Sequence, residues 1–258
     1  NYLPNYTAGL TFFIAVAATN LFHQGNWQRV FSAKNNSILK SSLIYSSIII
    51  FFIVFWMGYS GLLSYSLNPK VIPDLAFFDL ILNEKNSLLV IGILILAMSL
   101  TLSTIDTLIN AISSLIIVNG NQINKNLSGK KVKDQANIII LLLSVLVFIL
   151  ASKGYSILYL FLLADLLCCA AVITIFYGFF NKKINSKLAT YSIICGLISG
   201  LLFFPSQNFQ SSILVGNLIS IENFSILIKT NLLFISFVIS LIVPFLMIFV
   251  YSLRNSFK

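Results

Sequence analysis

Two acidic residues lie inside long apolar runs of the sequence. Asp106 stands in the run from Leu88 to Val118, and Asp165 stands in the run from Ile157 to Phe180. An ionisable side chain at the centre of a bilayer costs about 2.5–3.5 kcal/mol on insertion scales, and such residues commonly belong to ion or substrate pathways. We therefore interpret both as candidate pathway residues. For Asp165 a proton relay is a further possibility, and the alternative is a structural carboxyl that is protonated or bonded to a neighbouring helix.

Asp106 belongs to a polar stripe on an otherwise apolar segment. Ser99, Ser103, Asp106, Asn110 and Ser113 recur at spacings of 4, 3, 4 and 3 residues, which places them on one face of a helix. Hydroxyl and carboxylate oxygens suit a hard cation such as sodium, by extension from Ca²⁺ and Mg²⁺. The alternative is helix packing, because small polar residues let helices approach closely. With a carboxylate in the stripe, the pattern favours an ion or polar-substrate pathway.

A polar stretch follows the first apolar run. His23 is the only histidine, so it cannot form a metal site with other histidines, and we interpret it as an interfacial group. Gly25 lies within the polar run Gln24 to Arg29, which indicates an unwound helix of the kind that transporters use to expose backbone dipoles. The alternative is a simple helix end with Trp27 as an interfacial anchor. No nucleophile–base set or phosphate loop is visible, so we expect no enzyme.

The elements that carry these residues are membrane helices. Of the 258 residues, 58% are hydrophobic and 9% are charged, against about 25% charged in a soluble domain. About 20 apolar residues span the hydrocarbon core, and only helices and closed barrels satisfy the backbone there. These runs are too continuously apolar for barrel strands. The predicted fold class is an all-α membrane protein of about seven transmembrane helices, at Ala8–Phe22, Ser41–Leu63, Leu88–Val118, Ala136–Leu150, Ile157–Phe180, Leu188–Phe204 and Asn231–Leu253.

The loops predict the orientation of these helices. Alternate loops hold 12 and 4 of the 16 Lys and Arg residues, and the richer set belongs in the cytoplasm. This predicts a multi-pass protein of the cell membrane with its N-terminus outside and its C-terminus in the cytoplasm. The net charge of +9 is therefore a feature of topology, and we expect no nucleic-acid partner. The loops 28–40, 119–135, 181–187 and 254–258 form the basic set.

Two segments resemble the sodium:solute symporters, the family of the sodium/proline, sodium/pantothenate and sodium/glucose carriers. The segment Gln24 to Lys34 is similar to the family's stretch Q-x-x-x-Q-R-x-x-x-A-K, which follows a core helix. The segment Leu102 to Leu108, with Ser113 and Ser114 beyond it, resembles the family's helix S-T-x-D-S…S-S. The two motifs occur in the family's order along the chain.

The resemblance implies a leucine-transporter-type fold. Residues 1–180 would be its second inverted five-helix repeat and residues 181–258 two peripheral helices of the same transmembrane domain. The N-terminal repeat would be missing from this chain. The implied sodium ligands are the hydroxyls of Ser103 and Thr104 and the backbone carbonyl of Leu100. Solute contacts are implied at Thr19, Asn20 and Gln24, and Asp106 resembles an acidic residue found in some members.

The function that this resemblance implies is sodium-coupled symport of a small polar organic solute by alternating access. Its partners would be sodium, the solute, the bilayer and the missing repeat. The ion or substrate pathway would also include Asn110 and Asp165. Two alternatives remain at this point: a transporter-like sensor, and a seven-helix receptor or partner subunit without transport activity.

Overall fold

The computed structural model describes residues 3–82, 87–123, 129–180, 184–207 and 230–256, with single positions 209, 212, 214 and 228. The contacts divide the chain into two compact units. One unit combines Asn1–His23 with Tyr155–Lys258, and the other is Gln24–Gly154. The predicted boundary at residue 180, between an inverted repeat and two peripheral helices, rests on the family resemblance and not on contacts within the chain. This boundary and the missing N-terminal repeat both stay predictions.

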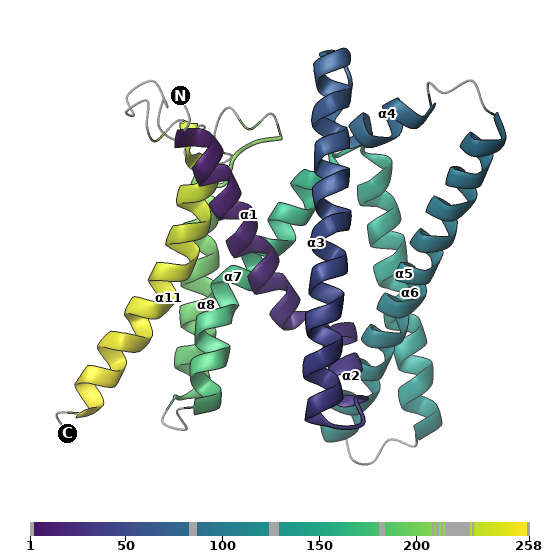
Figure 1. Cartoon of the computed structure of the whole chain (residues 1–258). Coiled ribbons are helices and arrows are strands. Elements are labelled where there is room, and N and C mark those ends of the chain that lie inside the picture. The colour runs from purple at the N-terminus through teal and green to yellow at the C-terminus, as the bar shows by residue number, and fades with distance from the viewer. Residues whose placement is uncertain are drawn as a thin grey trace. The chain divides into compact units, whose positions relative to one another are not determined.

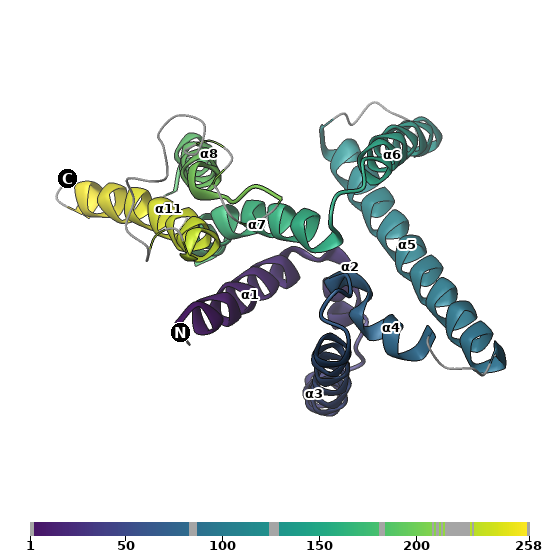
Figure 2. The ribbon, with the colours of Figure 1, turned by 90° about the horizontal axis from the view of Figure 1, so that it is seen from above.

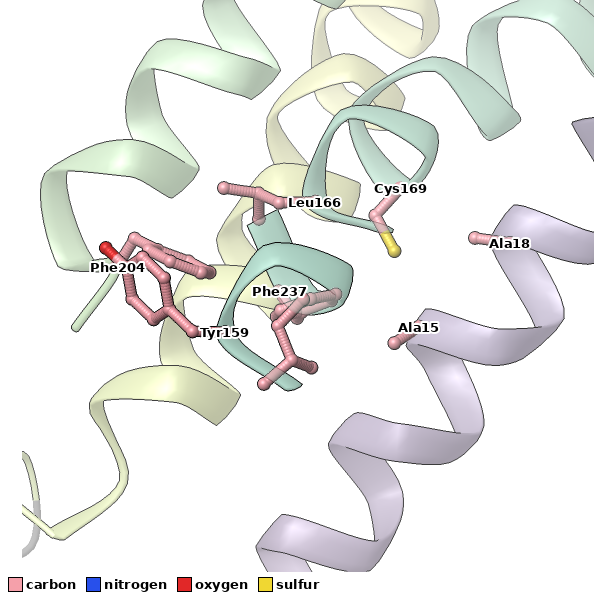
Figure 3. Close-up of a cluster of buried hydrophobic side chains, with 8 residues drawn as sticks. Ala15, Ala18, Tyr159, Leu166, Cys169, Phe204 and Phe237 are labelled. Carbon is pink, nitrogen blue, oxygen red and sulfur yellow. The ribbon is translucent and has the colours of Figure 1, made fainter. Parts of the chain in front are cut away.

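The first unit is a group of four helices, α1 (Leu3–Phe22), α7 (Ile157–Phe180), α8 (Ser186–Phe203) and α11 (Leu232–Ser256) (Figure 1). Helix α7 contacts the other three and lies between α1 and α8 (Figure 2). Its contacts bury one apolar cluster, in which small residues of α1 meet larger residues of α7, α11 and the end of α8 (Figure 3). The cluster comprises Ala15, Ala18, Tyr159, Leu162, Leu166, Cys169, Phe204 and Phe237.

Helices α8 and α11 approach each other through small residues. Gly196 and Gly200, four residues apart in α8, are buried against Ser236, Ser240 and Pro244 of α11. The Ser236 hydroxyl donates a hydrogen bond of 2.7 Å to the Gly200 carbonyl. This is the small-residue packing that is typical of membrane helices, where the absence of side chains lets backbones come close.

The second unit contains two long helices with shorter ones beside them. Helix α3 (Asn36–Leu67) has 32 residues and α5 (Ser87–Ile123) has 37. Helix α3 begins at an Asn35 cap, whose side-chain oxygen accepts a hydrogen bond from the Ile38 amide at 2.8 Å. Helix α4 packs on α3, and α2 and α6 pack on α5. The remaining elements are α2 (Gln24–Phe31), a 3-10 turn (Pro73–Leu75), α4 (Ala76–Leu82) and α6 (Gly129–Ser152).

Six helices in the described part of the chain are long and apolar enough to cross a membrane. They correspond to the predicted spans from the second to the seventh, and the fifth span has the predicted bounds. The all-α membrane fold is thereby confirmed. The first predicted span, Ala8–Phe22, lies in the 20-residue helix α1 but is not among the six. The polar residues Pro4, Asn5, Thr7 and Asn20 account for this, because they lower the hydropathy of every long window.

The observed helices extend beyond the apolar runs. Helix α3 begins five residues before the predicted Ser41, and α5 continues to Ile123. Backbone hydrogen bonding continues past the hydrocarbon limit, where water can also satisfy the helix ends. The predicted loops 119–135 and 181–187 lie partly outside the described residues. The side chains of α3 that face outward include Phe51, Phe55 and Trp56, as expected for a surface that contacts lipid.

The contact between α3 and α4 leads to a first prediction. The Ser64 hydroxyl is fully buried and donates to Oδ2 of Asp79 at 3.1 Å. Replacing Ser64 with alanine should weaken the docking of α4 by about 1 kcal/mol, the usual net value of one hydrogen bond. Hydrogen exchange of the α4 amides should then be roughly five times faster. Ser60→Ala is the control, since the Ser60 hydroxyl bonds the Trp56 carbonyl of its own helix. Equal exchange in both variants would contradict this role for Ser64.

Candidate functional site: polar groups within the membrane helices

Two of the predicted site residues meet inside the first unit. The Thr19 hydroxyl of α1 donates a hydrogen bond to Oδ1 of Asp165 in α7, although the two residues are 146 positions apart in the sequence. Asp165 is 6% exposed, and Thr19 is half-buried. Helix α1 brings its small residues Ala15 and Ala18 against α7, and this close approach puts the hydroxyl within reach of the carboxylate.

Sulfur atoms lie beside this pair. Cys168 has a side-chain interaction with Thr19. Cys169 is fully buried, with its thiol 3.9 Å from the Ile14 carbonyl of α1. All three cysteines of the sequence lie inside apolar runs and lack the spacing of metal ligands, which indicates small apolar side chains that fill space. Spacings of three and four residues on one helix already place both cysteines one turn from Asp165. Their contacts with Thr19 and Ile14 of α1 follow only from the docking of α1 on α7.

Asn20 and Gln24 flank the break in the first helix. Helix α1 ends at Phe22 and α2 begins at Gln24, with His23 outside both. Asn20 is exposed, and its Nδ2 donates to the Val16 carbonyl at 2.8 Å. Gln24 is half-buried at the start of α2, within the second unit. Gly25, where the sequence indicated an unwound helix, lies inside α2 and is helical, and the chain departs from helical structure only at His23. An unwound, solute-binding segment here stays a prediction.

The predicted sodium ligands lie on α5 in the second unit. Thr104 Oγ1 donates to the Leu100 carbonyl oxygen at 2.9 Å. Two oxygens at this separation can both contact one cation at roughly 2.3–2.6 Å, the range for Ca²⁺. Ser103 and Thr104 are both exposed within the unit. Thr101 and Thr107 of α5 make the same bond to the carbonyls of Ala97 and Ser103, at 2.8 and 2.9 Å. The sodium site therefore stays a prediction, since six to eight oxygens form a complete Ca²⁺ shell.

Asp106 and Asn110 lie on the same continuous helix, one and two turns beyond Ser103. Both side chains are exposed within the second unit. A carboxylate on a lipid-facing surface is costly, so we expect a polar partner or water to cover this side of α5. In the described residues, no group of three His, Cys, Asp or Glu side chains could hold a metal ion. The predicted sodium ligands are hydroxyl and carbonyl oxygens, and these do not belong to the four residue types named above.

Two further polar contacts in the first unit were not predicted from the sequence. Thr174 and Ser192 join α7 to α8 through a buried hydrogen bond of 3.0 Å. Thr7 donates to the Asn231 side chain, beside a cavity of about 170 Å³ that Thr11 and Phe209 also line. Sites for drug-sized ligands are typically about 300–1,000 Å³, so this cavity is too small for such a ligand.

The fold and these polar groups define a multi-pass, all-helical membrane protein. Over 170 residues the chain is 27% identical to a spermidine transporter of Candida albicans. The match covers 64% of this chain and 32% of the relative, so the chain spans about a third of that protein's length. No protein-family model matches the chain, and no solved structure matches it.

This distant similarity supports a role in membrane transport. It agrees with the predicted transport function at the level of the class of protein. The narrower predictions are the sodium:solute symporter family, sodium coupling, the orientation of the termini and the roles of individual residues. These stay predictions.

Proposed function

We propose that this chain is part of a secondary transporter that moves a small polar organic solute across the cell membrane together with sodium, by alternating access. The observation that carries the transport role is the similarity to a spermidine transporter over 170 residues. Sodium coupling rests on the resemblance of the α5 segment to the sodium:solute symporters. The oxygens of Thr104 and Leu100 lie 2.9 Å apart and are compatible with it, as other hydroxyl–carbonyl pairs of α5 would be.

In this proposal sodium binds at the face of α5 that carries Ser103 and Thr104 and stabilises the state open to the outside. The solute then binds beside the interrupted helix, near Thr19, Asn20 and Gln24. Asp106, Asn110 and Asp165 provide further polar groups along the pathway. The N-terminus lies outside and the C-terminus in the cytoplasm, in keeping with the 12-to-4 distribution of basic residues between alternate loops.

Spermidine is the first solute to test, because it is the substrate named for the relative and is a small organic cation. The full-length protein would be reconstituted into liposomes, and uptake of radiolabelled spermidine would be measured under an inward sodium gradient. We expect uptake to be faster with sodium than with potassium outside, and to stop when an ionophore collapses the gradient. An uptake rate that does not depend on the sodium gradient would contradict sodium coupling. Failure to take up spermidine or any other small polar solute would contradict transport.

A further inference from the structure

The carboxylate of Asp165 is incompletely satisfied. It lies at the ninth position of the 24-residue helix α7, well inside the membrane span. In the described residues, Oδ1 accepts the Thr19 hydroxyl and no second donor contacts the carboxylate. An ionised carboxylate can accept about four hydrogen bonds. One hydroxyl is therefore a small part of what this group needs when it is buried.

The second oxygen of the carboxylate is not completely enclosed. No fully buried side-chain oxygen or nitrogen in the described residues lacks a hydrogen-bond partner. Since Oδ2 has no donor, it retains some exposed surface, although the residue as a whole is only 6% exposed. Thr19, on the α1 side of the pair, is itself only half-buried.

No positive charge of the described first unit neutralises this carboxylate. The described basic residues there are Lys187 at the start of α8 and Arg254 at the end of α11, with His23 after α1. None of them forms an ion pair with Asp165. A buried charge without a partner is strongly unfavourable. A cation that binds at Oδ2 would supply the missing charge.

We propose that Asp165 and Thr19 form a binding site for an ammonium group of a cationic organic solute, with Asp165 as the residue that selects for positive charge. This inference rests on the proposed transport function. The ammonium group offers three N–H donors, and one of them would bond Oδ2 while the Thr19 hydroxyl holds Oδ1 in place. A charge-assisted bond of this kind is among the stronger hydrogen bonds in proteins.

The surroundings favour an ammonium group over sodium. Hard cations prefer shells made of oxygen, whereas thiols are soft ligands. Two of the polar groups around the carboxylate are the thiols of Cys168 and Cys169. The sodium site proposed on α5 consists of oxygens only, so the two sites differ in chemistry as well as in position along the chain.

The test is binding of radiolabelled spermidine to the purified full-length protein in detergent. Asp165→Asn keeps the size of the side chain and removes its charge. We expect it to raise the Kd for spermidine by roughly 10- to 100-fold, the equivalent of one lost charge-assisted hydrogen bond. Thr19→Val should raise the Kd by a smaller factor, about 3- to 10-fold for a neutral hydrogen bond. Asp165→Glu, which keeps the charge, should bind more tightly than Asp165→Asn.

Thr174→Val is the matched control, because it removes another buried hydroxyl bond of α7, to Ser192, and leaves the carboxylate intact. Its Kd should stay close to that of the wild type. An unchanged Kd in Asp165→Asn would overturn the inference, and so would a wild-type protein that does not bind spermidine. If Asp165→Asn does not fold, an unchanged Kd in Thr19→Val would overturn it equally.

Two further measurements separate this inference from the proposed function. The Asp165→Asn variant should still bind radioactive sodium. If this variant loses sodium binding but still binds spermidine, Asp165 is a sodium ligand and the ammonium site is overturned. Uptake into liposomes is measured in parallel. Spermidine binding that depends on Asp165, without sodium-driven uptake, would contradict the proposed function and support the ammonium site. Sodium-driven uptake that is unchanged in Asp165→Asn would support the proposed function and contradict the ammonium site.

Discussion

Replacing Gly196 with alanine should destabilise the protein by about 1–3 kcal/mol, the usual cost of overpacking a well-packed core. A Cβ atom at Gly196 would lie 2.5 Å from Cγ of Pro244 and 3.0 Å from the Ser240 carbonyl oxygen. The proline ring is stiff and the carbonyl is backbone, so neither can move aside without separating α8 from α11. Thermal unfolding of the purified protein in detergent measures the effect.

Gly58→Ala is the control for this substitution. Gly58 lies in α3, and a Cβ atom there would have no neighbour within 4 Å. Alanine should be neutral at this position or stabilise the helix by up to about 1 kcal/mol, because glycine is a poor helix former. Equal melting temperatures for the two variants would contradict the close packing at Gly196.

A double variant tests the cause of the destabilisation. The nearest neighbours of the added Cβ are the Pro244 ring atoms Cγ and Cδ, at 2.5 and 2.9 Å. Pro244→Ala removes both atoms, so the double variant should be more stable than the sum of the two single effects predicts. Strict additivity would mean that the clash lies elsewhere, for example with the Ser240 carbonyl.

Removing the hydroxyls of Ser103 and Thr104 together should raise the sodium concentration for half-maximal uptake by at least about tenfold, since losing groups that support a metal site typically costs 10–100-fold in affinity. The reason is the proposed ligand set on α5, in which the Thr104 hydroxyl lies 2.9 Å from the Leu100 carbonyl. The maximal uptake rate at saturating sodium should change much less. Uptake by the full-length protein in liposomes, measured against sodium concentration, gives both values.

The alternative role for these hydroxyls is local. The Thr104 hydroxyl donates to a carbonyl of its own helix, and the Ser144 hydroxyl does the same in α6, bonding the Ile140 carbonyl at 2.9 Å. Ser144→Ala is therefore the matched control and should leave the sodium requirement unchanged. Thr104→Ser keeps a hydroxyl and should retain sodium activation. A sodium requirement that is unchanged in the Ser103 and Thr104 double variant would show that these hydroxyls serve only their own helix.

The membrane helices could be predicted from the sequence because the bilayer allows few structures. A long apolar run in lipid must satisfy its own backbone, so it becomes a helix wherever it occurs. The predicted span Ile157–Phe180 is the observed helix α7. The helical period also predicted the polar stripe of α5, because the spacing from Ser103 to Asn110 needs only one continuous helix, and α5 is continuous there.

The ends of the helices and the status of α1 were harder to predict. Polar residues can continue a helix beyond the hydrocarbon region, as they do at the start of α3 and the end of α5. In α1, polar residues at both ends and a buried Thr11 make the segment less apolar than the other spans. Such polar residues lower the mean hydropathy of the segment, although hydrogen bonds to neighbouring helices can satisfy them in the folded protein.

The membrane helices, and the residues that share a face of each helix, could be predicted from the amino-acid sequence, because both follow from interactions within a single segment. Which faces pack against each other became apparent only in the folded structure. The contact of Thr19 with Asp165 spans 146 positions, and Gly196 in α8 meets Pro244 in α11. Such pairings depend on how many side chains fit together across two helices, and no local pattern encodes that fit.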